Sequence, residues 1–202
     1  MYLNILSEEQ FLQLKWLNLF KKDFMLVGGT AIALQLGHRR SIDFDLFKNK
    51  PFNKNHLKGI FKSHDIKFQL LHEDYDGLHV LINDVKWTFF FYPFQIKAKL
   101  KFEEYIKTPS ILTLAAMKAY ALGRRLKWKD YVDLYVLLTN NFSIEEISKE
   151  AKEIFQEGFS EKLFRQQLSY FEGIDYSEPI EWVANSKTEA EIKTALLEYA
   201  VI

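Results

Sequence analysis

The stretch that most constrains this chain is FMLVGGTAIALQLGHRRSIDFDLF, which occupies residues 24–47. A short apolar run, typical of a buried strand, ends in Gly28-Gly29. The helix-forming segment TAIALQLG follows and stops at Gly37, a residue typical of the position just after a helix. The pattern predicts a strand, a glycine turn, a short helix and a second strand in direct succession.

The second strand of this stretch, SIDFDLF, alternates apolar and polar residues. The alternation predicts Ile42, Phe44 and Leu46 on one face, and Asp43 and Asp45 on the other. Two carboxylates so close together repel each other unless a cation lies between them. Mg²⁺ suits this position because it binds few carboxylates and leaves its other sites to water and substrate phosphates. The alternative interpretation is an amphipathic edge strand with two solvated aspartates.

Gly28-Gly29 stands where a strand end meets a helix N-terminus. Glycines let a phosphate approach the backbone N–H groups closely, and the helix dipole favours negative charge at that end. In combination with the two aspartates, this context favours a nucleotide phosphate site with Mg²⁺.

Composition sets the broad class. The 202 residues are 48% hydrophobic, enough for a substantial core, and 27 Lys+Arg balance 27 Asp+Glu, so no overall basic field indicates a nucleic acid. Cysteine is absent, which excludes disulfides and thiolate zinc sites. The N-terminus lacks the pattern of a signal peptide, and no apolar run approaches the ~20 residues that span a bilayer. We therefore expect a soluble, cytoplasmic protein with no membrane contact.

The distribution of elements predicts an α+β fold. Residues 1–105 are expected to form an N-terminal domain with a mixed sheet of about four or five strands, and residues 106–202 a helical C-terminal domain. Ser7 marks a helix start, and the run WTFFFYPF is expected to supply core side chains. The expected C-terminal helices are 109–123, 126–139, 143–157, 160–172 and 187–201.

A second group of charged residues lies in the helical half. Lys118 is the only charged residue between Ile111 and Gly123, and it shares a helical stripe with apolar residues. Asp130 and Asp133 stand one turn apart in the next helix, beside an apolar arc. Because burying an unpaired ammonium is costly, Lys118 is expected either to meet an anion or to extend out to solvent. An interhelical salt bridge with purely structural value is the alternative.

Two further features bear on ligand binding. Four of the five arginines lie in the pairs Arg39-Arg40 and Arg124-Arg125, and a guanidinium offers a rigid fork for phosphate or carboxylate. The second pair, with KAKLK at 97–101, is the only candidate for a local nucleic-acid track. His38, inside GHRRS, could touch a substrate. The remaining histidines are interpreted as surface residues: His56, His64, His72 and His79.

The segment GGTAIALQLGHRRSIDFDLF, followed by Lys118, Arg124-Arg125 and KDYVDLYVLL, resembles the AbiEii/AbiGii-type toxins. These are nucleotidyltransferase-like proteins of toxin–antitoxin and phage-defence systems. The resemblance implies a minimal nucleotidyltransferase fold with a helical C-terminal half. It also implies Mg²⁺-dependent transfer of a nucleotidyl group from an NTP to an acceptor, an RNA such as tRNA or a protein, and neutralisation by a cognate antitoxin.

The resemblance assigns roles by position. Asp43 and Asp45 would ligate the metal, and Lys118 would contact phosphate as part of the catalytic group. One of the second-motif acids, Asp130 and Asp133, would orient or deprotonate the acceptor. The residues expected to hold the nucleotide phosphates are Gly28, Gly29, Thr30, Lys118 and either Arg39 or Arg40.

One position departs from the pattern. Nucleotidyltransferases commonly carry a third carboxylate on a later strand, and the strand VKWTFFFYP has Thr88 at the position expected to be acidic. A hydroxyl is a poor substitute at a two-metal site. The alternative function is therefore a non-catalytic nucleotide- or protein-binding module on the same scaffold. An RNA-binding protein that uses KAKLK and Arg124-Arg125 is a third alternative.

Overall fold

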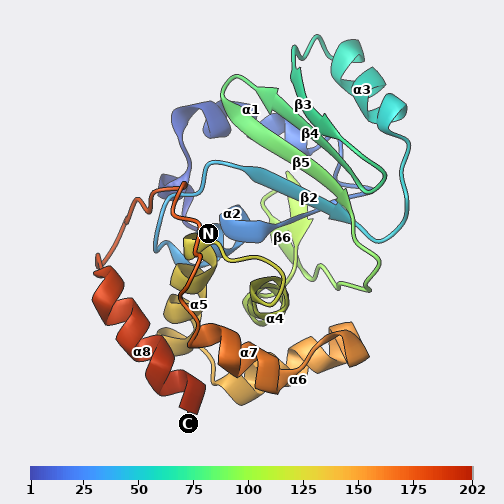
Figure 1. The fold of residues 1–202 in the computed structure, drawn as a ribbon. Helices are drawn as coiled ribbons and strands as arrows, with labels where there is room; N and C mark the ends of the chain where they lie inside the picture. Colours follow the sequence, from blue (N-terminus) through green and yellow to red (C-terminus); the bar gives the residue numbers. More distant parts are fainter. Residues whose placement is uncertain (202) are drawn as a thin grey trace. The chain divides into compact units, whose positions relative to one another are not determined.

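The structure, a computed structural model, describes residues 1–201, which fall into two compact units (Figure 1). The sheet unit comprises Met1–Leu36 and Arg40–Ser110, and the helical unit comprises Gly37–Arg39 together with the chain from Ile111 onward. The boundary expected between residues 105 and 106 lies at the start of the last strand of the sheet unit.

The sheet unit contains four helical segments and seven strands within the described residues. In chain order they are η1 (Leu3–Ile5), α1 (Glu8–Leu17), β1 (Met25–Val27), α2 (Gly28–Leu36), β2 (Phe44–Lys48), α3 (Lys54–Ser63), β3 (Gln69–Glu73), β4 (Gly77–Ile82), β5 (Val85–Phe91), β6 (Leu100–Phe102) and β7 (Ile106–Thr108). The strands form one mixed sheet in the order β3-β4-β5-β2-β1-β7-β6. The sheet is wider than expected because the three-residue strands β6 and β7 are too short to carry a periodic signal.

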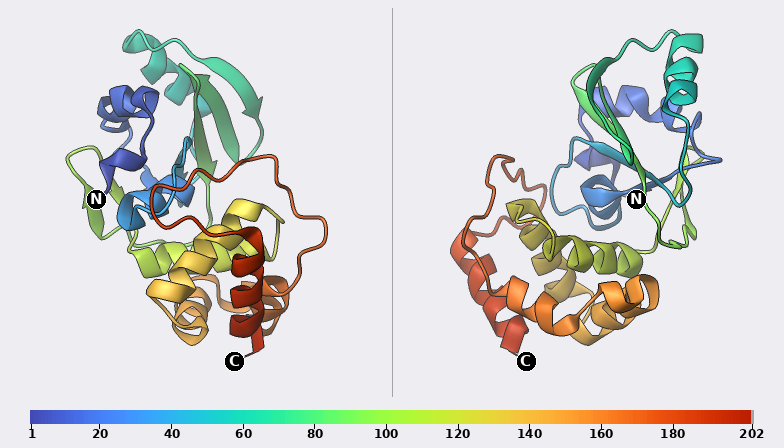
Figure 2. Two further views of the ribbon diagram at one scale, coloured as in Figure 1. Left: turned by 90° about the vertical axis from the view of Figure 1, so that its left-hand side faces the viewer. Right: turned by 45° about the vertical axis from the view of Figure 1, so that its right-hand side comes forward.

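One face of the sheet carries an aromatic core. The rings of Phe20 and Phe61, from the end of the α1 region and from α3, pack on Phe89 with centroids 4.8 and 5.9 Å away. Phe44 and Trp87 meet at 4.9 Å on the same face. Helices α1 and α3 cover this side (Figure 2). Because side chains alternate along a strand, the residues between these aromatics lie on the other face of the sheet.

The expected second strand is shorter than its sequence pattern. Strand β2 begins at Phe44, and Ile42 is 57% exposed, so the prediction that Ile42 shares a strand face with Phe44 and Leu46 is wrong. Asp43 consequently lies just before the strand, and only Asp45 is part of it. The register pairs Asp45 with Val27 of β1 and with Thr88 of β5. This places the end of β1, and hence the start of α2, directly beside Asp45.

The helical unit follows the expected pattern closely. Its elements are α4 (Ile111–Leu122), α5 (Trp128–Asn140), α6 (Ile144–Phe155), η2 (Gln156–Gly158), α7 (Glu161–Leu168) and α8 (Glu189–Val201). Helix α4 packs on α5, α6 and α7, and α8 packs on α5 and α7. A long irregular segment, residues 169–188, joins α7 to α8 (Figure 1). None of the helices in the described chain has both the length and the apolar character needed to cross a membrane.

Three residues from the N-terminal half belong to the helical unit. Arg39 forms a bridge with Trp182, and Val183 donates a backbone hydrogen bond to the His38 carbonyl at 3.0 Å. The segment 37–39 is thereby fixed to the α7–α8 connection. Gly37 adopts φ +69° just after α2, which is the conformation expected of a glycine at a helix end.

Candidate functional site

The turn from β1 into α2 is shaped around one carboxylate. Gly28 has φ +74°, a conformation that side chains disfavour, and it is the first residue of α2. A Cβ at this position would stand 2.1 Å from Oδ2 of Asp45. The Asp45 carboxylate therefore occupies the space that any larger residue at position 28 would need. The first glycine of the motif therefore lets the Asp45 carboxylate lie against the N-terminus of α2, which is the positive end of the helix dipole.

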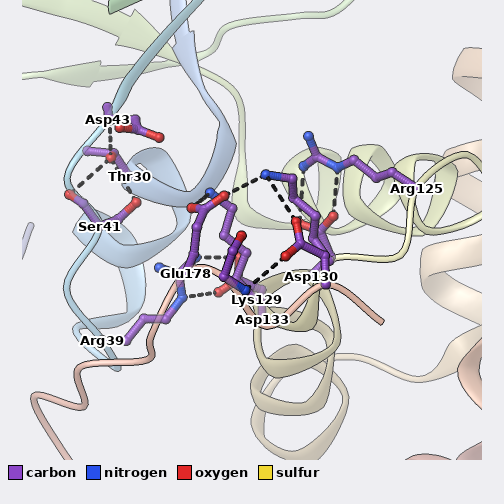
Figure 3. A network of polar contacts seen from close by, with 12 residues as sticks. Thr30, Arg39, Ser41, Asp43, Arg125, Lys129, Asp130, Asp133 and Glu178 are labelled. Carbon is purple, nitrogen blue, oxygen red and sulfur yellow. Dashed lines mark hydrogen bonds and ion pairs between the residues drawn. The ribbon is translucent and has the colours of Figure 1, made fainter. Parts of the chain in front are cut away.

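Thr30 ties α2 to the loop before β2. Its hydroxyl donates to the Asp43 carbonyl and lies 3.0 Å from the Ser41 hydroxyl, as Figure 3 shows. Thr30 is 1% exposed. A phosphate contact from this residue would therefore have to come from its backbone. The Thr30 side chain instead holds the loop that carries Asp43.

The Asp45 carboxylate has an environment that suits a cation. Asp45 is half-buried, yet its carboxylate has no hydrogen-bond or salt-bridge partner among the described residues. With Asp43 it offers oxygen ligands only, and Mg²⁺ prefers such ligands in small number, with phosphates and water completing the shell. Within residues 1–201 no group of three or more His, Asp or Glu side chains forms a closed metal centre. The pair Asp43 and Asp45 thus fits a metal that is completed by substrate, and does not fit an all-protein metal cage.

The position beside Asp45 on the next strand is Thr88, which is paired with it in the parallel β2–β5 register. Thr88 is 7% exposed, and its hydroxyl lies 3.3 Å from Nδ1 of His79 on β4. His79 is opposite Thr88 in the antiparallel β4–β5 register. Asp45, Thr88 and His79 therefore form a row across three strands. The sequence pattern indicated only a surface or space-filling residue at His79, because nothing in it aligns β4 with β2.

The helical unit contains a buried charge network around α5. Asp133, 0% exposed, accepts two bonds from Arg39, Nε–Oδ1 at 2.7 Å and Nη2–Oδ2 at 2.9 Å. It also lies 2.8 Å from His38 Nε2 and 2.8 Å from Lys118 Nζ. Figure 3 shows this clamp of Arg39 on Asp133. Asp133 is thus contacted by three basic side chains.

Asp130 is the second buried carboxylate of α5 and is also 0% exposed. It binds the Lys118 ammonium, and Arg125 donates to it through Nε at 2.8 Å and Nη2 at 3.1 Å. Lys118 therefore lies on the otherwise apolar face of α4 because its ammonium binds both Asp130 and Asp133. The interaction that the sequence left open, a salt bridge between these helices, is present.

Electrostatics keep this network charged. Burial would raise the pKa of Asp133, but the charges of Arg39 and Lys118 and the bonds from His38 and Arg39 hold that pKa well below its usual range. Burial would likewise raise the pKa of Asp130, yet Lys118 and Arg125 lower it. For Lys118, burial acts to lower the pKa, and Asp130 and Asp133 outweigh it and raise the pKa. The two aspartates are poor proton acceptors in this state.

The ion pairs of this network join the cations Arg39, Lys118 and Arg125 to the two carboxylates of α5. Glu178 adds a further negative charge that acts on Arg39. A lysine ammonium has three N–H donors, and two of those on Lys118 are directed at Asp130 and Asp133. The third has no carboxylate partner among the described residues.

The two arginine pairs have different surroundings. Arg39 is 4% exposed and committed to Asp133, whereas its neighbour Arg40 is exposed and donates to the Leu6 carbonyl at 3.3 Å. Arg40 is therefore the more solvent-exposed of the two guanidinium groups. Arg124 stacks on the Tyr120 ring at 3.5 Å, and Arg125 binds Asp130. The second pair is engaged within the helical unit.

The structure also reveals one charge cluster that the sequence pattern did not indicate. Glu178, from the segment between α7 and α8, binds Lys127 at 2.6 Å and also Lys129. Burial would raise the pKa of Glu178, but these two lysines lower it to about 2. The partners are about 50 positions apart in sequence, so no local spacing could have predicted the contact.

Comparison with solved structures defines the class. The chain is similar to a putative nucleotidyltransferase of Helicobacter pylori, with 17% identity, a TM-score of 0.55 and coverage of 99% of this chain and 92% of that one. It is also similar to MenT4, a nucleotidyltransferase toxin of Mycobacterium tuberculosis H37Rv, with 12% identity, a TM-score of 0.57 and coverage of 94% and 80%. The protein has a nucleotidyltransferase fold, as the sequence predicted.

The family can be stated more closely. Residues 10–184 match the family of AbiEii nucleotidyl transferase toxins of type IV toxin–antitoxin systems, and the chain belongs to this family. An uncharacterized protein of Aquifex aeolicus (strain VF5), aq_aa25, is 30% identical over 156 residues, which is 74% of each chain.

Proposed function

We propose that this protein is a Mg²⁺-dependent nucleotidyltransferase that transfers a nucleotidyl group from an NTP to a macromolecular acceptor, an RNA such as tRNA or a protein. The observation that carries the proposal is the Asp45 carboxylate, which has no salt-bridge partner in the described chain and lies against Gly28 at the N-terminus of α2. Membership of the AbiEii family supports the reaction class.

The site residues of the sheet unit each have a defined role in this proposal. The backbone N–H groups of Gly28, Gly29 and Thr30 would hold triphosphate oxygens at the helix N-terminus. Asp43 and Asp45 would hold Mg²⁺, which when bound neutralises phosphate charge and orients the triphosphate. An acceptor hydroxyl then forms a bond to the α-phosphorus, the bond to the bridging oxygen breaks, and pyrophosphate leaves with the electron pair.

The residues of the helical unit would assist through charge. We propose a phosphate contact for Lys118, and a second one for Arg40, which is the more exposed residue of the pair Arg39-Arg40. Asp133 and Asp130 would hold Lys118 and Arg39 in place. This positioning task replaces the acceptor deprotonation that the resemblance implied, because both carboxylates are buried and ion-paired.

Membership of the family also supports a proposal for the biological setting. We propose that the protein is the toxin of a toxin–antitoxin pair that acts in phage defence, in the cytoplasm where NTPs are available, and that a cognate antitoxin restrains it. Type IV toxin–antitoxin membership supports the antitoxin.

Thr88 favours a second candidate, a non-catalytic nucleotide- or protein-binding module. A hydroxyl stands where a third carboxylate would support catalysis, and Thr88 is paired in register with Asp45. This candidate predicts Mg²⁺-dependent NTP binding with no transferred product.

A labelling experiment separates the two candidates. The purified protein is incubated with Mg²⁺, each α-labelled NTP in turn, and a cell extract fractionated into RNA and protein. We expect label to move to one class of macromolecule and to be lost in the Asp43→Ala/Asp45→Ala variant, whose folding is checked by circular dichroism. NTP binding without transfer would contradict the enzyme and support the binding module. If the protein neither binds NTP nor transfers label, both candidates are wrong.

A further inference from the structure

The residues that carry a role in the proposed function include no acceptor for the proton of the attacking hydroxyl. Nucleotidyl transfer to a hydroxyl releases a proton, and general bases are commonly placed within hydrogen-bond reach of such a hydroxyl. Asp130 and Asp133 are ion-paired and buried, and Thr88 has no carboxylate. The row across the sheet contains one other titratable side chain close to Thr88, His79 of β4.

The register brings His79 to the side of the sheet on which Asp45 lies. Asp45 pairs with Thr88, and Thr88 pairs with His79, so the two side chains rise from one face with one residue between them. Two strand spacings put their Cα atoms about 10 Å apart. A near-attack contact of ~3–3.5 Å and a hydrogen bond of ~2.8 Å together span about 6 Å from phosphorus to imidazole nitrogen. A phosphate held at Asp45 therefore leaves room for an acceptor hydroxyl before His79.

The imidazole is oriented by its neighbours. Nδ1 lies 3.3 Å from the Thr88 hydroxyl, and a Cβ at Gly77 would stand 3.2 Å from Nε2. The contact with Thr88 lets Nδ1–H donate to the hydroxyl and leaves the lone pair on Nε2. Nε2 lies beside Gly77, where the missing side chain leaves room for the imidazole. His79 itself is half-buried, while Thr88 is almost fully covered.

The charges around His79 favour its neutral form. Burial lowers its pKa, and Lys86 of β5 and His72 of β3 lower it further, while Asp74 and Asp45 act in the opposite direction. The net effect is a pKa below the ordinary value of 6.5, so the imidazole is free to accept a proton at neutral pH.

We propose that His79 is the catalytic base of this nucleotidyltransferase and that Thr88, which stands in the place of a third carboxylate, orients it. This role rests on the proposed function. The acceptor O–H gives its proton to Nε2 of His79, and the acceptor oxygen forms a bond to the α-phosphorus. Pyrophosphate departs with the electrons of the broken P–O bond. The imidazolium then returns the proton to solvent.

The test compares His79→Asn with His72→Asn. Asparagine at position 79 can keep the contact with Thr88 but lacks Nε2, and His72 is the neighbouring imidazole on β3, with its ring centre 5.7 Å from that of His79. Single-turnover transfer is measured against pH, alongside Mg²⁺-dependent NTP affinity and thermal unfolding. We expect a ~10²–10⁴-fold loss of rate in His79→Asn, as for other general bases, with unchanged NTP affinity. His72→Asn should keep the wild-type plateau rate.

The pH profile distinguishes a base from a structural residue. The wild-type rate should fall with unit slope at pH values below the His79 pKa, and this limb should vanish in His79→Asn. Free imidazole should restore part of the rate to His79→Ala, in proportion to its unprotonated fraction. A His79→Asn rate within threefold of wild type, with the limb retained, would overturn the role of His79 alone. A wild-type protein that binds NTP but transfers nothing would instead overturn the proposed function and the base together.

Discussion

Asp45 and Asp133 have opposite surroundings. The difference distinguishes a candidate site residue from a structural one. Asp45 lies against Gly28 with no salt-bridge partner in the described part of the chain, whereas Asp133 is met by Arg39, His38 and Lys118. A carboxylate without a counter-charge is ready for an external cation. A carboxylate with three basic contacts already has its partners.

Replacing Asp45 by Asn should therefore separate activity from stability. Nucleotidyl transfer should fall by more than the roughly 10–100-fold typical of changes to residues that support a metal ligand, because Asp45 is proposed to bind the metal directly. The free energy of unfolding should change by less than about 1 kcal/mol, since no ion pair is broken. Transfer assays and urea unfolding check both values, and Asp84→Asn in the exposed β4–β5 turn serves as the control. A large loss of stability would show that Asp45 is a structural residue.

At the scale of elements, the β1–α2 turn depends on the strand beside it. Glycine at position 28 is explained by two independent facts, its positive φ and the carboxylate of β2 in the space of its missing side chain. The local turn and the pairing of β1 with β2 therefore have to agree.

The Gly28→Ala change should disturb both backbone and site. We expect a loss of more than about 1 kcal/mol in the free energy of unfolding from backbone strain, together with displacement of the Asp45 carboxylate. Gly59→Ala is the matched control, because Gly59 lies inside α3 and a Cβ there meets nothing within 4 Å. That control should gain about 0.5–1 kcal/mol. Equal unfolding curves for the two variants would contradict the packing argument.

At the scale of the whole molecule, the helical unit is built from two separate parts of the sequence. Gly37–Arg39 stands between α2 and β2 in sequence but groups with the helices, where Arg39 clamps Asp133. The stability of the helical unit thus depends on a segment of the N-terminal half. Residues 106–202 alone would lack this clamp.

The buried network should make the protein sensitive to acid. The folded pKa of Asp133 lies below its unfolded value of about 3.9, so its stabilising effect is present above that value and is lost as pH falls through the folded pKa. Asp133→Asn should cost about 3–5 kcal/mol at neutral pH, because it breaks a buried pair, and should flatten the loss of stability below pH ~4. Urea unfolding at stepped pH measures this, with Glu198→Gln on the surface of α8 as control. An unchanged acid dependence in Asp133→Asn would show that other groups control acid unfolding.

Several features could be predicted from the sequence because they are local. The glycine turn, the helix after it and the five C-terminal helices follow from spacing and end residues, and Lys118 could be expected to meet an anion because its helix is otherwise apolar. The family was indicated by two motifs together, the segment from Gly28-Gly29 to Asp45 and the later K…RR…KDYVDLYVLL pattern.

Other features required the tertiary structure because they join residues that are distant in sequence. Strand pairing decided that Asp45 lies over Gly28 and that Thr88 is followed across the sheet by His79. Helix packing and the return of residues 37–39 decided that Arg39 and Asp133, 94 positions apart, form one ion pair. The sequence by itself determined which elements form and which residue types stand beside the turn, since these depend on neighbours within a few positions. Only the tertiary structure decided which charges are paired, because burial and register belong to the packed sheet and helices and not to any single segment.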